Sequence, residues 1–113
     1  MPVIPRIHQQ VFDAVSRPNA LNMSTWHLDE TVNEAGAYCG TTHCRAGWVV
    51  ALAGKEGREL EQFHNTELAA MLIYDASCPQ LPVSPCRFFH SDNVAMDDMK
   101  RMAEEEANLT TAA

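Results

Sequence analysis

The residues best suited to chemistry lie together in the ten-residue segment 39–48, which reads Cys-Gly-Thr-Thr-His-Cys-Arg-Ala-Gly-Trp. This segment contains the thiols of Cys39 and Cys44 and the imidazole of His43. Its two threonines can accept hydrogen bonds from the unpaired N–H groups at the start of a helix. The apolar run 49–53 follows directly. We therefore predict a loop that leads into a buried helix and places the reactive groups at the helix start.

Nucleophilic catalysis by Cys44 is one chemistry that this arrangement would allow. A cysteine at the N-terminus of a helix has a lowered pKa, because the helix dipole and the free N–H groups favour the thiolate. His43 or His27 would act as the general base, and Asp29 would orient His27 if a local turn brings the two together. The same N–H groups can form an oxyanion hole. The candidate catalytic residues are therefore Cys44, His43 and His27.

A zinc site formed by Cys39, His43 and Cys44 is a second chemistry that fits these residue types. Zinc prefers four nitrogen or sulfur ligands in a tetrahedral arrangement. A fourth ligand would come from His27 or from a proline-rich segment farther along the chain. That segment and its flanks supply three further candidates: Cys78, Cys86 and His90. The spacing differs from the usual Cys-x-x-Cys pairs, so zinc binding stays one hypothesis among several.

Two further interpretations of the thiols involve neither catalysis nor a metal. Free cysteine is among the most buried residue types and packs as a small apolar side chain. Cys44 is expected on the same helical face as Trp48, which favours simple burial. Alternatively, Cys39 and Cys44 would form a redox pair. The sequence leaves these alternatives open.

The elements that must position these residues are predicted from periodicity and from residues that end helices. Apolar residues recur at helical spacing, and no stretch shows the sustained alternation of a strand. Gly54 suits the left-handed position just after a helix. Gly47 lies inside a predicted helix, where a glycine costs about 1 kcal/mol and usually marks the close approach of another backbone. We predict helices over residues 4–16, 43–53, 67–76 and 92–107. Residues 28–35 are suited to a weak helix, and residues 55–63 to a short helix or turn.

The proline-rich segment 77–85 is expected to form an extended loop before the last helix. It contains Pro79, Pro82 and Pro85, and proline interrupts helical hydrogen bonding. Two aromatic residues follow this loop and are expected to anchor its end in the core. They are Phe88 and Phe89. Trp26 is likewise expected to be a core tryptophan.

The last predicted helix carries three methionines on one side: Met96, Met99 and Met102. This stripe suits either core packing or an adaptable partner-binding surface, since thioether side chains repack easily. Residues 108–113 are expected to form a loose tail. The sequence thus predicts an all-α fold, a single domain over residues 1–113 with four to five short helices.

The composition indicates a globular protein with an acidic balance. The chain has 113 residues, of which 46% are hydrophobic, and its length fits one domain. Fifteen acidic residues against eight basic ones give a net charge of −7, which disfavours direct binding to nucleic acid. The acidity favours solubility or an acidic face that docks on a basic partner. No signal sequence and no long apolar run are seen, so we expect a cytoplasmic protein without a membrane segment. Its four cysteines are then expected to be reduced thiols or metal ligands.

The segment 39–48 also resembles a motif of small, uncharacterised bacterial and phage proteins, Cys-Gly-Thr-x-x-Cys-x-x-Gly-Trp-Ala. Val49 stands here in place of the alanine. The segment 23–27, Met-Ser-Thr-Trp-His, looks similar as well, and the likeness covers about half of the chain. The resemblance implies a small intracellular accessory protein of a kind that phages encode. It brings no known activity or cofactor.

The leading expectation for function is a small acidic module that binds another protein. An inhibitor or regulator of a host system, encoded by a phage, would fit the size, the acidity and the methionine-rich helix. An enzyme is the less favoured class, because no complete catalytic set is evident. The alternatives are a thiol-dependent hydrolase or transferase that uses Cys44, and a structural zinc-binding domain.

Overall fold

Five α-helices and one 3₁₀ helix make up the regular structure of the part of the protein that the computed structural model describes. The structure describes the backbone of residues 1–111 and the side chains of residues 1–109. The elements are α1 (Ile7–Val15), α2 (Arg45–Leu52), α3 (Gly54–Phe63), α4 (Thr66–Ser77), the 3₁₀ helix η1 (Pro85–Phe89) and α5 (Asp92–Thr111). Within this range the only β-type pairings are isolated bridges, so the predicted all-α fold is confirmed.

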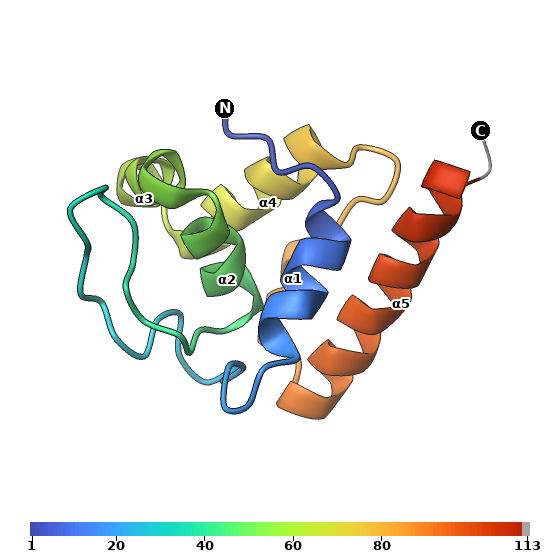
Figure 1. Ribbon diagram of the computed structural model, residues 1–113, viewed down its shortest axis with the longest axis horizontal. Coiled ribbons are helices and arrows are strands. Elements are labelled where there is room, and N and C mark those ends of the chain that lie inside the picture. Colours follow the sequence, from blue (N-terminus) through green and yellow to red (C-terminus); the bar gives the residue numbers. More distant parts are fainter. Residues whose placement is uncertain (112–113) are drawn as a thin grey trace.

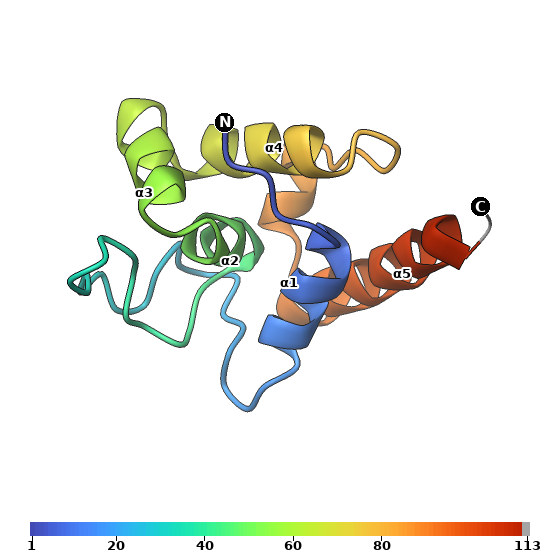
Figure 2. The same cartoon turned by 45° about the horizontal axis from the view of Figure 1, so that its top comes forward.

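The helices form two groups that share α1. On one side α1 packs along α5, and on the other side α2 packs against α1, α3 and α4 (Figure 1). A long irregular segment, residues 16–44, connects α1 to α2 and lies beside α2 and α3 in both views (Figure 2). No helix in the described part of the chain is both long enough and apolar enough to cross a membrane.

Helix α1 begins at Ile7, three residues later than predicted, because Arg6 adopts a left-handed conformation with φ 52°. Arg6 provides no side-chain cap. Instead, the carboxylate of Glu106 in α5 accepts hydrogen bonds from the backbone N–H groups of His8 (3.2 Å) and Gln9 (3.0 Å). An acidic group at a helix N-terminus also interacts favourably with the helix dipole. Glu106 therefore caps α1 across the fold and joins it to α5.

Helix α2 begins at Arg45, and its N-cap is Cys44 rather than one of the predicted threonines. The Cys44 Sγ accepts a hydrogen bond from the Gly47 N–H at 3.3 Å. Thr42, by contrast, donates its hydroxyl to the Asn19 carbonyl. Gly54, with φ 65°, has the left-handed conformation predicted for it after the helix.

The predicted helix over residues 28–35 is wrong, because side chains there bond to nearby backbone instead. Asp29 Oδ1 accepts from the Thr31 N–H, and Asn33 Oδ1 accepts from the Ala37 N–H. Such local bonds offer the backbone an alternative to helical hydrogen bonding. The segment is therefore irregular.

The remaining predicted elements are observed with small shifts at their ends. The short helix or turn predicted over residues 55–63 is helix α3, and the helix over 67–76 is α4. The proline-rich segment forms a loop between α4 and η1, as predicted. Helix α5 continues to Thr111, so residues 108–111 of the predicted loose tail are helical; residues 112–113 lie outside the described part of the chain.

The methionine stripe of α5 packs into the core. Met99 and Met102 are buried, and Met96 packs against the same cluster while partly exposed. Beside this stripe, Asp98 forms an ion pair at 2.5 Å with the fully buried guanidinium of Arg45. This pair links the start of α2 to α5.

Candidate functional site

The two candidate histidines of the sequence lie together in a hydrogen-bonded cluster. His27 Nδ1 lies 2.7 Å from His43 Nδ1, and His27 Nε2 lies 2.6 Å from Glu61 Oε2. Tyr38 donates its hydroxyl to the other oxygen of Glu61, and Thr66 donates to Oε2 at 2.7 Å. We call these five residues the histidine cluster. The histidines and Tyr38 come from the loop 16–44, whereas Glu61 belongs to α3 and Thr66 opens α4.

The partners of each nitrogen determine where the protons lie. His43 Nε2 lies 2.9 Å from the Gly40 carbonyl, which can only accept, so this nitrogen donates. His43 Nδ1 therefore accepts, and His27 Nδ1 donates to it. The remaining nitrogen of His27, Nε2, faces the Glu61 carboxylate. The two rings therefore form a hydrogen-bonded chain between Glu61 and the Gly40 carbonyl.

The ionisation of the neighbouring groups agrees with this assignment. Burial would raise the pKa of Glu61, but hydrogen bonds from His27, Tyr38 and Thr66 together outweigh burial and hold that pKa below its usual value. Burial lowers the pKa of His43, which favours its neutral form. Burial, together with the hydrogen bond and charge of Glu61, raises the pKa of Tyr38 well above its usual range. Glu61 is therefore the anion of the cluster, and Tyr38 stays a neutral phenol.

Cys44 does not join this cluster through a hydrogen bond to either histidine within the described residues. Its side chain is buried, and its Sγ accepts from the Gly47 N–H. Burial raises the pKa of Cys44 to about 11, although backbone N–H groups act in the opposite direction. Asp29 does not orient His27 either, because Glu61 takes that position. The thiolate that nucleophilic catalysis needs is thus disfavoured. Sequence reasoning missed Glu61 because this residue lies in α3, outside the motif.

The ligand atoms of Cys39, His43 and Cys44 do not form a converging group among the described residues. Cys39 is exposed in the loop, whereas His43 and Cys44 are buried, and all four cysteines are free. Within the described residues, the group of three or more potential ligands that converges is a different one, formed by His8, Cys78 and Glu106. The two thiols of the suggested Cys39–Cys44 redox pair are free and do not form a disulfide.

The Cys44-x-x-Gly47 part of the motif holds the backbone that carries Trp26. The Cys44 N–H donates to the carbonyls of Thr25 (3.1 Å) and Trp26 (3.3 Å). A Cβ atom at Gly47 would lie 1.8 Å from the Trp26 carbonyl oxygen, so only glycine leaves room for this contact. The close backbone approach predicted at Gly47 is thus confirmed, and the motif acts as a seat for the 23–26 segment.

Trp26 and Phe89 are exposed rather than in the core, contrary to expectation. Trp26 is 37% exposed and Phe89 is 64% exposed, and their rings meet edge to face with centroids 5.9 Å apart. Of the two phenylalanines, Phe88 is the one buried in the core, as expected. Beside the exposed pair lies a cavity of about 310 Å³, lined by Met23, Ser24, Thr25, Trp26, Phe88 and Phe89.

An acidic hollow adjoins this aromatic cavity, because Trp26 lines both. The hollow has a volume of about 350 Å³ and is lined by Trp26, Glu61, Asn65, Thr66 and Glu67. The Glu61 carboxylate that organises the histidine cluster therefore also lines a surface depression. Comparisons with protein families, curated proteins and solved structures found no match to this chain.

Proposed function

We propose that this protein binds a short segment of a partner protein that carries a large apolar side chain next to a basic one. The apolar side chain occupies the cavity beside Trp26 and Phe89. The basic side chain lies in the adjoining hollow, near Glu61 and Glu67. The observation that carries this proposal is the pair of adjoining depressions, one aromatic and one acidic, that share Trp26.

The aromatic cavity has the size and lining of a binding site. Its volume of about 310 Å³ falls within the range of roughly 300–1,000 Å³ that is usual for ligand pockets. Tryptophan is enriched among the residues that dominate binding energy at interfaces. Trp26 and Phe89 keep much of their surface in water although both are large apolar side chains. Covering them with a partner would remove apolar area from water, which is favourable.

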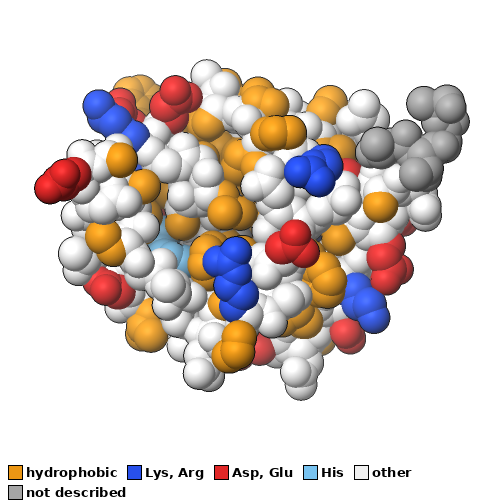
Figure 3. All heavy atoms as spheres, in the orientation of Figure 1, with side chains coloured by type: hydrophobic (Ala, Val, Ile, Leu, Met, Phe, Trp, Pro, Cys, Tyr) orange, Lys and Arg blue, Asp and Glu red, His pale blue; other side chains and the backbone are white. Residues whose placement is uncertain are grey.

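The acidic hollow adds charge complementarity toward a cation. Glu61 is ionised at neutral pH, as its lowered pKa indicates, and Glu67 lies beside it in the hollow. The whole chain carries a net charge of −7, which attracts a basic partner from a distance. On the face drawn in Figure 3, acidic and basic side chains are interspersed. The hollow therefore places two acidic side chains beside Trp26.

The histidine cluster and the Cys44-x-x-Gly47 seat contribute to binding by holding the loop 16–44 in place. A loop that is already ordered loses less entropy on binding than a flexible one. Trp26 stands directly before His27, whose ring bonds to His43 and Glu61. An inhibitor or regulator of a host system, encoded by a phage, would use such a rigid surface. The thiol-dependent alternative needs an ionised Cys44, and the burial of that thiol does not favour it.

A random peptide library displayed on phage tests the proposal. We expect enrichment of peptides with an aromatic or large aliphatic residue near Lys or Arg. Trp26→Ala is expected to weaken the binding of an enriched synthetic peptide by about 2 kcal/mol, roughly 30-fold, as is usual for a central aromatic anchor. Glu67→Gln is expected to weaken peptide binding less than Trp26→Ala does and to reduce the salt dependence of the affinity. Phe63→Ala is the matched control, because Phe63 is 82% exposed and lines neither depression.

Two outcomes would overturn the proposal. One is the absence of an enriched consensus in repeated selections. The other is a consensus peptide whose affinity is unchanged by Trp26→Ala and by Phe89→Ala, while circular dichroism shows that both variants are folded.

A further inference from the structure

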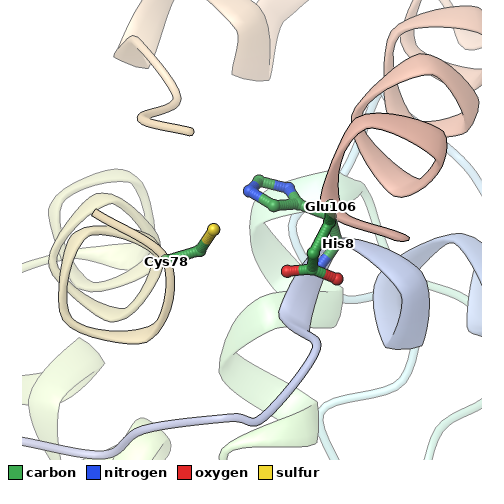
Figure 4. Close-up of side chains that lie close together, drawn as sticks. All are labelled: His8, Cys78 and Glu106. Atoms are coloured by element: carbon green, nitrogen blue, oxygen red, sulfur yellow. The ribbon is translucent and has the colours of Figure 1, made fainter. Parts of the chain in front are cut away.

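Three potential metal ligands converge where α1, α4 and α5 meet, remote in sequence from the histidine cluster. His8 belongs to α1, Cys78 is the C-cap of α4, and Glu106 belongs to α5. One ligand atom from each lies within 4.8 Å of the other two. Figure 4 shows the Cys78 sulfur pointing toward the His8 ring and the Glu106 carboxylate. All three residues are buried, with exposures of 1%, 6% and 6%.

His8 has a buried nitrogen that nothing in the described protein satisfies. Its Nε2 lies 3.1 Å from the Leu81 carbonyl, whereas Nδ1 has no hydrogen-bond partner. Leaving a polar atom buried without a partner is costly, and such exceptions in folded proteins need an explanation.

We propose that His8, Cys78 and Glu106 bind a divalent transition-metal ion of the zinc type. The donor set of imidazole, thiolate and carboxylate is one that zinc accepts, whereas a thiolate disfavours magnesium and calcium. The charges also balance, because one thiolate and one carboxylate neutralise a divalent cation. Cys78 loses its thiol proton to solvent when the metal binds.

The distances need only a small adjustment for coordination. Bond lengths of about 2.0–2.3 Å place the ligand atoms of a tetrahedral zinc roughly 3.3–3.8 Å apart. The observed limit of 4.8 Å is longer by about 1 Å, a change that side-chain rotation can supply. Glu106 already caps α1 through both carboxylate oxygens. A carboxylate has about four lone-pair sites, so it can keep these bonds and also bind a cation.

A cavity provides both an entry path and a fourth ligand. It measures about 270 Å³ and is lined by Arg6, Ser77, Cys78, Gln80, Glu106 and Leu109. Gln80 Oε1 lies 3.8 Å from the Cys78 sulfur, so its amide oxygen or a water can occupy the fourth position. A bound cation would tie three helices together, because its ligands come from α1, from the end of α4 and from α5.

Cobalt(II) is the probe of choice, because a thiolate ligand gives it a charge-transfer absorption that is independent of any biological activity. The titration uses the full chain with the exposed thiols replaced, Cys39→Ser and Cys86→Ser, after treatment with a chelator. We expect one cobalt ion per chain, a thiolate-to-cobalt band, displacement of cobalt by zinc, and a melting temperature that rises with added metal.

Variants of the remaining residues decide which ligands are used. Adding Cys78→Ala, or separately His8→Gln, is expected to abolish the band or to weaken cobalt binding at least tenfold. Cys44→Ser is the matched control and should keep the band, because serine is itself a good N-cap. The proposal is overturned if no band forms in the folded parent protein, or if the band survives Cys78→Ala. It is also overturned if the band disappears with Cys44→Ser while circular dichroism stays unchanged.

Discussion

The histidine cluster and the site formed by His8, Cys78 and Glu106 combine similar groups but differ in how far the protein satisfies them. In the cluster, both nitrogens of His27 and of His43 have protein partners. At the other site, His8 Nδ1 has none within the described residues. A saturated network holds a structure together, whereas an unsatisfied one leaves capacity for an external ligand. This difference, and not the mere presence of histidine and cysteine, is the reason to propose a metal site at His8 and not at the histidine cluster.

The largest effect is expected from Gly47→Ala, which removes the seat of the Trp26 segment. The added Cβ would meet the Trp26 carbonyl oxygen at 1.8 Å, so the backbone must move. We expect a loss of about 3 kcal/mol in the free energy of unfolding, measured with urea. Gly54→Ala is the control, because it has positive φ but nothing within 4 Å, and it should cost about 1 kcal/mol. Equal losses for the two variants would argue against a special role of Gly47 in holding the backbone of Trp26.

Breaking the histidine cluster should be the next largest effect. Glu61→Gln removes the negative charge to which His27, Tyr38 and Thr66 all hydrogen-bond. It should lower the free energy of unfolding by about 2 kcal/mol. Glu59 lies in the same helix, and its ion pair with Lys55 is exposed, so Glu59→Gln should change stability by less than about 0.5 kcal/mol.

His8→Gln in metal-free protein should lower the free energy of unfolding by about 1 kcal/mol, because Nδ1 has no bond to lose. A His8→Gln loss that exceeds the Glu61→Gln loss would reverse the comparison.

Lowering the pH should reduce the free energy of unfolding of the metal-free protein through both the histidine cluster and the His8 site. Burial lowers the folded-state pKa of His43 and of His8 below the unfolded value of about 6.5. The unfolded chain therefore takes up protons first, and stability falls as the pH drops below about 6.5. The lowered pKa of Glu61 adds a second loss at more acidic pH, below about 4.3, where the unfolded carboxylate takes up its proton first. Urea unfolding between pH 7.5 and 5 should show a decline that His8→Gln makes shallower; an unchanged slope would speak against a buried neutral His8.

The smallest perturbation is chemical labelling of the thiols without mutation. Cys39 and Cys86 are exposed and should react quickly with a thiol reagent, whereas Cys44 and Cys78 are buried and should react only after unfolding. Mass spectrometry of the labelled peptides identifies each site. With a pKa of about 11, Cys44 has little thiolate at neutral pH. Rapid labelling of Cys44 in the folded protein would revive the thiol-dependent hypothesis.

Helices were predictable from the sequence because their apolar periodicity is local. The irregular segment 16–44 was not, since its conformation depends on side-chain bonds such as that of Asn33 and on contacts with α2 and α3. The motif correctly located a buried helix start, but Glu61 joins His27 only through tertiary packing. Pattern alone could not show that Trp26 faces water.

The His8, Cys78 and Glu106 site was missed because its ligands are distant in sequence and each lies on a different helix or helix end. One local sign of it exists. His8 falls within the apolar stripe formed by Ile4, Ile7, Val11 and Val15, and a histidine on a buried helical face requires a partner. The partner itself could be found only in three dimensions.

Nitrogen-15 NMR of the histidine side chains during a zinc titration tests the difference between the two regions most directly. In the chain with Cys39→Ser and Cys86→Ser, we predict that zinc shifts the imidazole signals of His8 and leaves those of His27 and His43 unchanged. Shifts at His27 or His43, or no shift at any histidine, would contradict the assignment of metal binding to the His8 site and not to the histidine cluster.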